Sequence, residues 1–239
     1  LGVMLALAWP AWGANCYVDE SKTGGTNSGA DTTNAFLTIA AATVAARTAG
    51  NVIYVRGNHT ETIGANVEFT SDGTAAAPIE IRGDDGTKWP STAGQVPVFT
   101  MGAFTFNIST DDYWIVNRVK IQDITGVGIT HVNSTGTVIK NCIFEDAAAN
   151  DDIFISARSI NGPLGVYDCT FDGSAAHTTN YGLGIINGSF GNRAIVERCT
   201  FDDLYVGIGG GSYGANADVA NCEFGQSNDN TTDVAQVSV

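Results

Sequence analysis

Apolar residues in the C-terminal half of the chain recur in a phrase of four positions: a polar residue, cysteine, any residue, phenylalanine. The phrase occupies residues 141–144, 168–171, 198–201 and 221–224, so its cysteines are 27, 30 and 23 residues apart. A weaker copy lies 23 residues upstream, with Val119 in the cysteine slot and Ile121 in the phenylalanine slot. Recurrence of a fixed pattern every ~20 to 30 residues is typical of a solenoid, in which each turn of chain is one repeat.

Other apolar positions keep step with this phrase. Because strand side chains alternate between two faces, the cysteine and phenylalanine slots lie on one buried face. The position three residues before the cysteine slot is apolar in every coil: Val116, Ile139, Val166, Val196 and Val219. An apolar pair beside glycine follows in each full coil: Val127/Ile129, Ile153/Ile155, Leu183/Ile185 and Val206/Ile208. Three short strands per coil predict an all-β parallel β-helix.

An antiparallel sandwich is the alternative fold, and it should show hairpin turns between alternating strands. Asn161-Gly162 and Asn187-Gly188 are such turn signals. Both fall at the same place in the coil, so we interpret them as corners of a β-helix.

The N-terminal half predicts a cap followed by the first coils. Apolar residues spaced three or four apart predict one helix over residues 34–48, with an N-cap at residues 31–33 and a stop at Gly50. We expect three parts: an apolar segment at 1–14, the cap at 15–50 and the β-helix at 51–239. Expected N-terminal strands are Cys16–Val18, Val52–Val55, Val67–Phe69, Ile79–Ile81, Val96–Thr100, Phe104–Ile108 and Trp114–Val116.

Three segments of this half carry a family resemblance: CYVDESKTGGTNSG, NAFLTIAAATVAARTAGNVIYVRGNHTET and SDGTAAAPIEIRG. They resemble the right-handed parallel β-helix proteins of the pectate-lyase-like superfamily, over roughly residues 16–224. The resemblance implies that the helix caps the open end and that Ile53–Val55 starts the first coil. The family includes lyases, hydrolases, phage tailspikes and non-catalytic virion or surface proteins, so the resemblance implies a fold rather than an activity.

The net charge of the chain limits the classes of partner that it is expected to bind. Eleven Lys and Arg against 25 Asp and Glu give a net charge of −14. Nucleic acid and anionic membranes need cationic neutralisation, so we expect neither as a partner. The composition fits an extracellular or virion surface, and such a surface can also hold cations.

The first 13 residues are apolar and uncharged, but they are shorter than the roughly 20 residues that a membrane span needs. They are either part of a secretory signal or a retained anchoring arm. The last coil ends in apolar residues without a capping helix, so we expect self-association, a partner, or further residues to cover it.

Five cysteines without metal-ligand spacing argue against a zinc site. Stacked coils place the repeat cysteines about 4.8 Å apart, but with parallel side-chain directions that disfavour a disulfide. We expect a column of buried thiols.

An acidic step follows the phenylalanine slots and predicts an outward row of carboxylates. The row is a calcium site, a pair of catalytic carboxylates, or a set of chain-turning residues. For calcium the predicted ligands are Glu145, Asp146, Asp172, Asp202 and Asp203, and for catalysis the candidates are Asp146, Asp172, Asp202 and Lys140. No other cofactor is expected.

The longer coils place their extra residues at one corner, which is where solenoids usually bind ligands. Aromatic and polar residues near this corner predict a carbohydrate contact: His177, Asn180, Tyr181, Tyr205 and Tyr213. Two functions therefore stay open. The first is a non-catalytic β-helix on a virion or extracellular surface that contacts carbohydrate or particle proteins. The second is a secreted polysaccharide lyase or glycoside hydrolase that uses the acidic row.

Overall fold

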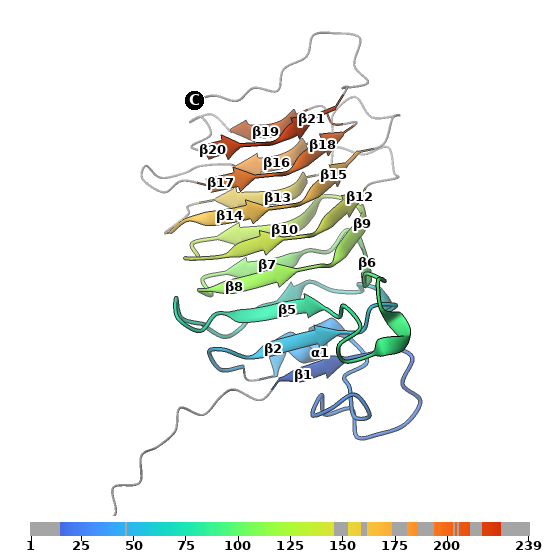
Figure 1. Cartoon of the computed structure of the whole chain (residues 1–239). Coiled ribbons are helices and arrows are strands. Elements are labelled where there is room, and N and C mark those ends of the chain that lie inside the picture. Colours follow the sequence, from blue (N-terminus) through green and yellow to red (C-terminus); the bar gives the residue numbers. More distant parts are fainter. Residues whose placement is uncertain are drawn as a thin grey trace, which may run out of the picture.

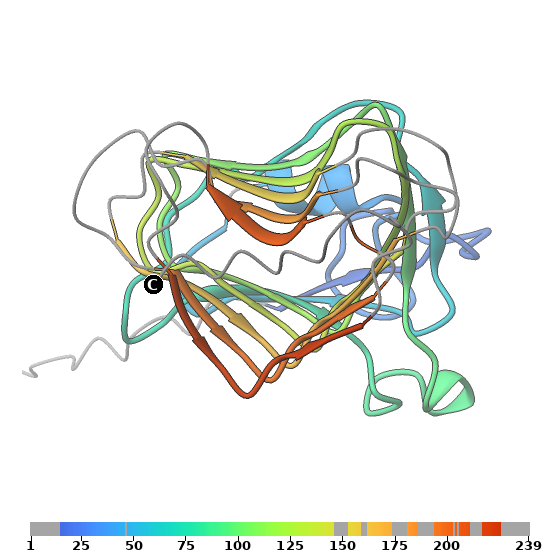
Figure 2. The same ribbon diagram turned by 90° about the horizontal axis from the view of Figure 1, so that it is seen from above.

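The chain folds into a right-handed parallel β-helix, in which successive coils stack along one axis (Figure 1). The structure is a computed structural model that describes residues 15–45, 47–145, 153–158, 162–173, 181–185, 194–202, 204, 206–210 and 217–225. Figure 2 looks along the stack and shows the coils superposed, with three sheets around a common core. The predicted fold class is confirmed.

Every strand pair is parallel and joins one coil to the next. The eight-stranded sheet contains β1 (Cys16–Val18), β2 (Val52–Val55), β5 (Ile79–Gly83), β8 (Trp114–Asn117), β11 (Val138–Lys140), β14 (Leu164–Tyr167), β17 (Ala194–Glu197) and β20 (Ala217–Ala220). The seven-stranded sheet contains β3 (Thr60–Thr62), β6 (Val98–Gly102), β9 (Lys120–Ile124), β12 (Ile143–Glu145), β15 (Thr170–Asp172), β18 (Thr200–Asp202) and β21 (Glu223–Phe224). The six-stranded sheet contains β4 (Val67–Glu68), β7 (Phe106–Ser109), β10 (Val127–Val132), β13 (Ile153–Arg158), β16 (Tyr181–Ile185) and β19 (Val206–Gly210).

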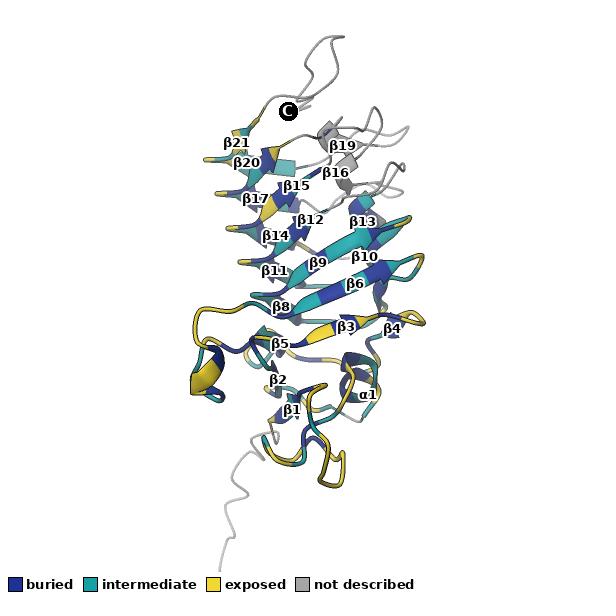
Figure 3. Cartoon of the chain, turned by 90° about the vertical axis from the view of Figure 1, so that its right-hand side faces the viewer, coloured by how far each residue is buried: buried dark blue, intermediate teal, exposed yellow. Residues whose placement is uncertain are grey.

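The phenylalanine slots form a continuous stack inside the helix. Phe171 lies between Phe144 and Phe201, with ring centroids 4.8 Å away on each side and ring planes within 8° of parallel. Phe224 continues the stack 5.0 Å from Phe201. Figure 3 shows the alternation of buried and half-buried residues along β6. The inward positions of one coil therefore pack on the same positions of the next.

A sharp corner precedes each cysteine and joins the eight-stranded to the seven-stranded sheet. In the five coils that begin with β8, β11, β14, β17 and β20, the corner residue has a left-handed backbone with φ between 52° and 59°: Arg118, Asn141, Asp168, Arg198 and Asn221. Asn and Asp tolerate this conformation better than other non-glycine residues. The corner N–H groups of Asn141 and Asp168 donate to Tyr167 O and Glu197 O of the following coil, both at 3.0 Å. The first position of the repeated phrase is thus the corner itself.

The repeat cysteines are free thiols that line the core just past this corner, as predicted. The Cys169 thiol contacts Tyr167 O at 3.2 Å and Ile139 O of the preceding coil at 3.8 Å. Cys142, Cys199 and Cys222 repeat this arrangement. Because burial raises the pKa of the Cys169 thiol well above its usual range, this cysteine has little thiolate character.

The helix is much shorter than the predicted span of residues 34–48. Helix α1 covers only Ile39–Val44, and its N-cap is Thr38. The preceding segment is extended because Phe36 pairs with β1, donating to Tyr17 O at 2.7 Å and accepting from Asp19 N at 2.8 Å. The helical spacing of apolar residues was therefore overridden by pairing with the first strand.

A buried polar network holds this cap. Glu61 of β3 accepts hydrogen bonds from Ile39 N at 2.8 Å and from His59 Nε2 at 2.9 Å. The other ring nitrogen of His59 accepts from Glu20 N at 3.1 Å. Strand β3 was not among the expected strands, since its residues Thr60–Thr62 are all polar. The buried carboxylate explains why a polar strand belongs in this coil.

One coil of the six-stranded sheet has a different register from the one expected. Ile155 pairs with Leu183, and Tyr181 pairs with Ile153. The expected alignment of Leu183/Ile185 with Ile153/Ile155 was wrong by two residues. A shift of two residues keeps the same side chains on the same face, so the apolar alternation does not exclude it. Leu183 is displaced in the same way from the next coil, where it pairs with Ile208. Val127/Ile129, Ile153/Ile155 and Val206/Ile208 align with one another as expected.

We predict that Phe171→Ala lowers the free energy of unfolding by about 3 to 5 kcal/mol, because it removes a fully buried ring from the middle of the stack. Urea unfolding followed by circular dichroism measures the effect. Thr170→Ala, at the exposed neighbouring position, is the control and should stay within about 0.5 kcal/mol of wild type. A loss below about 1 kcal/mol for Phe171→Ala would contradict the stack.

The buried side chain of His131 makes the stability of the fold sensitive to acid. Its side chain is fully buried beside Ile108 and Ala157 of the adjacent strands, and neither ring nitrogen has a hydrogen-bond partner among the described residues. Burial lowers the His131 pKa to about 4, whereas an unfolded histidine titrates near about 6.5. The unfolded chain thus binds the extra proton first, and stability falls as the pH drops through this window.

We expect His131→Leu to be more stable than wild type, with a difference that grows by up to about 3 kcal/mol between pH 7 and pH 4. Urea unfolding of both proteins at several pH values measures this difference and cancels the titration of the other groups. A difference that is constant with pH would show that His131 is not held neutral in the folded state.

Candidate functional site

The predicted acidic row exists on the outer face of the seven-stranded sheet. Gln122, Glu145, Asp172 and Asp202 are successive partners in the parallel register, one from each strand from β9 to β18. They alternate with the buried phenylalanine slots, so they face away from the core. Glu145 is 42% exposed. The structure thus places Glu145, Asp172 and Asp202 in one row, as the sequence pattern predicted.

A lysine joins this row at its N-terminal end. The Lys120 Nζ atom of β9 lies 2.7 Å from Glu145 Oε2 of β12. The pair links two neighbouring coils diagonally across the sheet. Lys120 was not among the predicted site residues, although its place two residues before Gln122 on the same strand would have put it on the row's face.

Lys140 belongs to a different surface. It ends β11 in the eight-stranded sheet, and the left-handed corner at Asn141 separates it from Glu145 of the same coil. The structure therefore does not place Lys140 in the row with Asp172 and Asp202, as the catalytic alternative had grouped them. The corner signal, a polar residue before each cysteine, was present in the sequence.

Several predicted residues lie outside the described residues, so their places in the site stay predictions: Asp146, Asp203, His177, Asn180, Tyr205 and Tyr213. The backbone of Tyr181 is described as the first residue of β16, beside Ile153. Within the described ranges, no three His, Cys, Asp or Glu side chains gather as a metal site. No helix in this part of the chain is long and apolar enough to cross a membrane.

A second group of carboxylates lies where the six-stranded sheet turns toward the eight-stranded sheet. Burial, and then the charges of Asp72, Asp112 and Glu68, raise the Asp111 pKa to about 6. Asp112 N donates to Asp72 Oδ1 at 2.9 Å, and Asp112 Oδ1 accepts from Thr135 N at 2.7 Å. These hydrogen bonds tie the corners of neighbouring coils together, which is a structural role.

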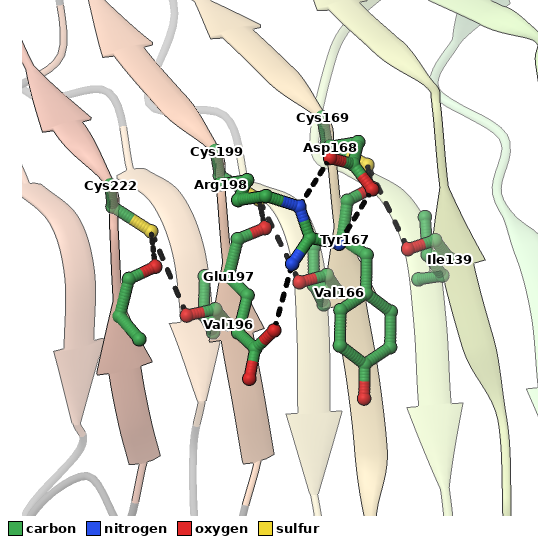
Figure 4. A network of polar contacts seen from close by, with 11 residues as sticks. Ile139, Val166, Tyr167, Asp168, Cys169, Val196, Glu197, Arg198, Cys199 and Cys222 are labelled. Carbon is green, nitrogen blue, oxygen red and sulfur yellow. Dashed lines mark hydrogen bonds and ion pairs between the residues drawn. The ribbon is translucent and has the colours of Figure 1, made fainter.

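The outer face of the eight-stranded sheet combines aromatic, apolar and charged residues. Tyr17 and Tyr54 stack with centroids 5.7 Å apart, and Lys88 Nζ lies 4.8 Å from the Tyr54 ring centroid. Farther along the sheet, Arg198 forms two hydrogen bonds with Asp168, at 2.7 and 2.9 Å, and one with Glu197 at 2.9 Å (Figure 4). These bonds raise the Arg198 pKa and lower that of Asp168.

Comparison with solved structures identifies the fold. A rhamnogalacturonan lyase matches with a TM-score of 0.52 and 15% identity, over 90% of this chain and 58% of its own. Pectate lyase Pel9A matches at 0.51 and 15%, over 90% and 66%. The fold is the parallel β-helix that these two lyases also have. An alginate lyase from Paenibacillus sp. str. FPU-7 matches at 0.50 and 14%, over 88% and 75%.

The chain spans less than two thirds of the length of the first two of these lyases. No family model matches the sequence, and no curated protein matches it. At this identity the likeness concerns the fold, while activity depends on the residues of the site.

The Lys120–Glu145 pair yields a prediction about the row. Because the two side chains are 23% and 42% exposed, Lys120→Met should lower the free energy of unfolding by no more than about 1 kcal/mol at low salt. The effect should shrink in 1 M NaCl, where charges are screened within about 3 Å. Lys140→Met is the matched control. A salt-independent loss above about 2 kcal/mol would show that Lys120 supports the fold by packing instead.

Proposed function

We propose that this chain is a non-catalytic β-helix of an extracellular or virion surface that contacts carbohydrate. The arrangement of its basic groups carries the proposal. A lyase needs a free Lys or Arg that removes a proton beside the substrate carboxylate. In the described part of the acidic row, Lys120 is held at 2.7 Å by Glu145, and Lys140 lies on another sheet.

The fold supports a polymeric ligand. Successive coils present the same outward position at intervals of about 4.8 Å, so each sheet offers a flat, repeating surface along the stack. An extended polysaccharide is a repeating chain that can contact many such positions weakly and still bind well in total. The similar solved structures are named for lyases of rhamnogalacturonan, pectate and alginate, which favours carbohydrate over protein as the class of ligand.

A polysaccharide lyase is the second candidate, and the names of these solved structures favour it. Under this alternative, Asp172 and Asp202 would bind Ca²⁺ through their carboxylate oxygens, and Lys120 would leave Glu145 to act as the base. The two candidates share the fold and differ in whether the ligand is cleaved.

Incubation with a panel of neutral and acidic polysaccharides, with and without Ca²⁺, separates the two candidates. We expect binding by affinity electrophoresis, no unsaturated or reducing ends, and the same behaviour for Lys120→Met. Release of unsaturated sugars that is lost in Lys120→Met but kept in Lys140→Met would establish the lyase and end the non-catalytic proposal.

A further inference from the structure

We infer that the outer face of the eight-stranded sheet carries a saccharide-binding platform centred on Tyr167, which takes a neutral pyranose chain. The inference rests on the proposed carbohydrate contact and assigns it to a surface away from both the acidic row and the variable corner. Figure 4 shows the Tyr167 ring lying along its own strand, beside the Arg198 ion pairs.

Glycine at position 165 lets the ring lie flat. Gly165 and Tyr167 are two residues apart on β14, so both face outward. A Cβ atom at position 165 would lie 2.9 Å from Tyr167 Oη and 3.0 Å from Cζ, too close for an undisturbed ring. Gly165 is nevertheless buried, because the ring covers it. One ring face therefore rests on the backbone of the strand.

The other face of the Tyr167 ring is not covered by a ring or a cation of the described residues. Tyr54 on the same sheet has Arg82 and Lys88 over its ring and Tyr17 stacked beside it. No ring or cation of the described residues stacks on Tyr167 in this way, and Tyr167 is half-buried rather than covered. Tyr167 is thus a supported aromatic surface that is free to stack on a ligand.

Apolar residues extend the platform on both sides. Val138 of β11 and Ile195 of β17 are the in-register neighbours of Gly165, so they flank the ring. Both are half-buried on the outer face, as is Ile115 of β8. Together they form an apolar floor several strands wide, which suits the C–H face of a sugar ring.

Polar residues form a rim beside the apolar floor, two positions farther along the same strands. Lys140 and Glu197 are the in-register neighbours of Tyr167 on the adjacent strands. Asn117 of β8 is in turn the in-register neighbour of Lys140. The Asn117 amide is held within the sheet, since its Oδ1 accepts from Asn141 Nδ2 at 3.0 Å and its Nδ2 donates to Glu80 Oε1 at 2.8 Å. The Lys140 ammonium and the Glu197 carboxylate beside an apolar floor match the hydroxyl edge of a pyranose, which both donates and accepts hydrogen bonds.

The local charge selects a neutral ligand. Near the platform the cations Lys140 and Arg198 face the carboxylates Asp168 and Glu197. Asp218 of β20, the in-register neighbour of Ile195, adds a further carboxylate, and the whole chain carries a net charge of −14. A polyuronate would approach against the field of the protein and meet no net positive charge at the platform. A neutral polysaccharide meets no such opposition.

Three substitutions test the platform by isothermal titration calorimetry against the neutral glycan that binds best on an array. We expect Tyr167→Ala to weaken binding at least about tenfold, as for truncated aromatic contacts at other interfaces. Gly165→Ala keeps the ring but tilts it off the strand, and should weaken binding several-fold. Tyr167→Phe keeps the stacking face and should bind within about threefold of wild type. Thr170→Ala, at an exposed position of the seven-stranded sheet, is the control that should change nothing.

Urea midpoints close to wild type confirm that each variant is folded. If the wild type binds a glycan and both Tyr167→Ala and Gly165→Ala bind it equally well, the platform is wrong and the proposed function survives elsewhere on the chain. Tighter binding of polyuronates than of neutral glycans overturns the inferred ligand. If no neutral or acidic glycan binds, the proposed function fails together with the platform.

Discussion

The parallel, in-register stacking of identical inward positions is the constraint on which the rest of the structure depends. Each inward side chain rests on its counterpart one coil away, as the Phe144–Phe171–Phe201 rings do at 4.8 Å. The left-handed corner before each cysteine keeps the coils in phase, because its N–H donates to the next coil at the same place each time. Because this stacking involves only the inward side chains, the outward residue between two inward ones is free to vary.

That freedom gives the two outer faces different chemistry on one backbone. The seven-stranded sheet exposes an acidic row that is partly paired by Lys120. The eight-stranded sheet exposes tyrosines, branched aliphatic residues and balanced ion pairs. Both faces repeat at the same interval, so each can meet an extended polymer. Their charges then decide which polymer approaches.

Features tied to the buried face could be predicted from the sequence. The phenylalanine slots, the apolar slot before each corner and the free thiols all follow from a pattern that must repeat for the coils to pack. Features that depend on a single distant partner could not. Phe36 leaves the helical pattern to pair with β1, and polar β3 is kept in its coil by the Glu61 network. The two-residue register error at Leu183 kept the correct face, which is why alternation did not reveal it.

The central claim is that the inward rungs of successive coils stack in register, and nuclear Overhauser contacts between selectively labelled phenylalanine rings test it most directly. The account predicts contacts from Phe171 to Phe144 and to Phe201, and none between Phe144 and Phe201. A Phe171 ring without contact to either neighbour, or in contact with residues of the outward positions, would contradict the register and every surface assignment that follows from it.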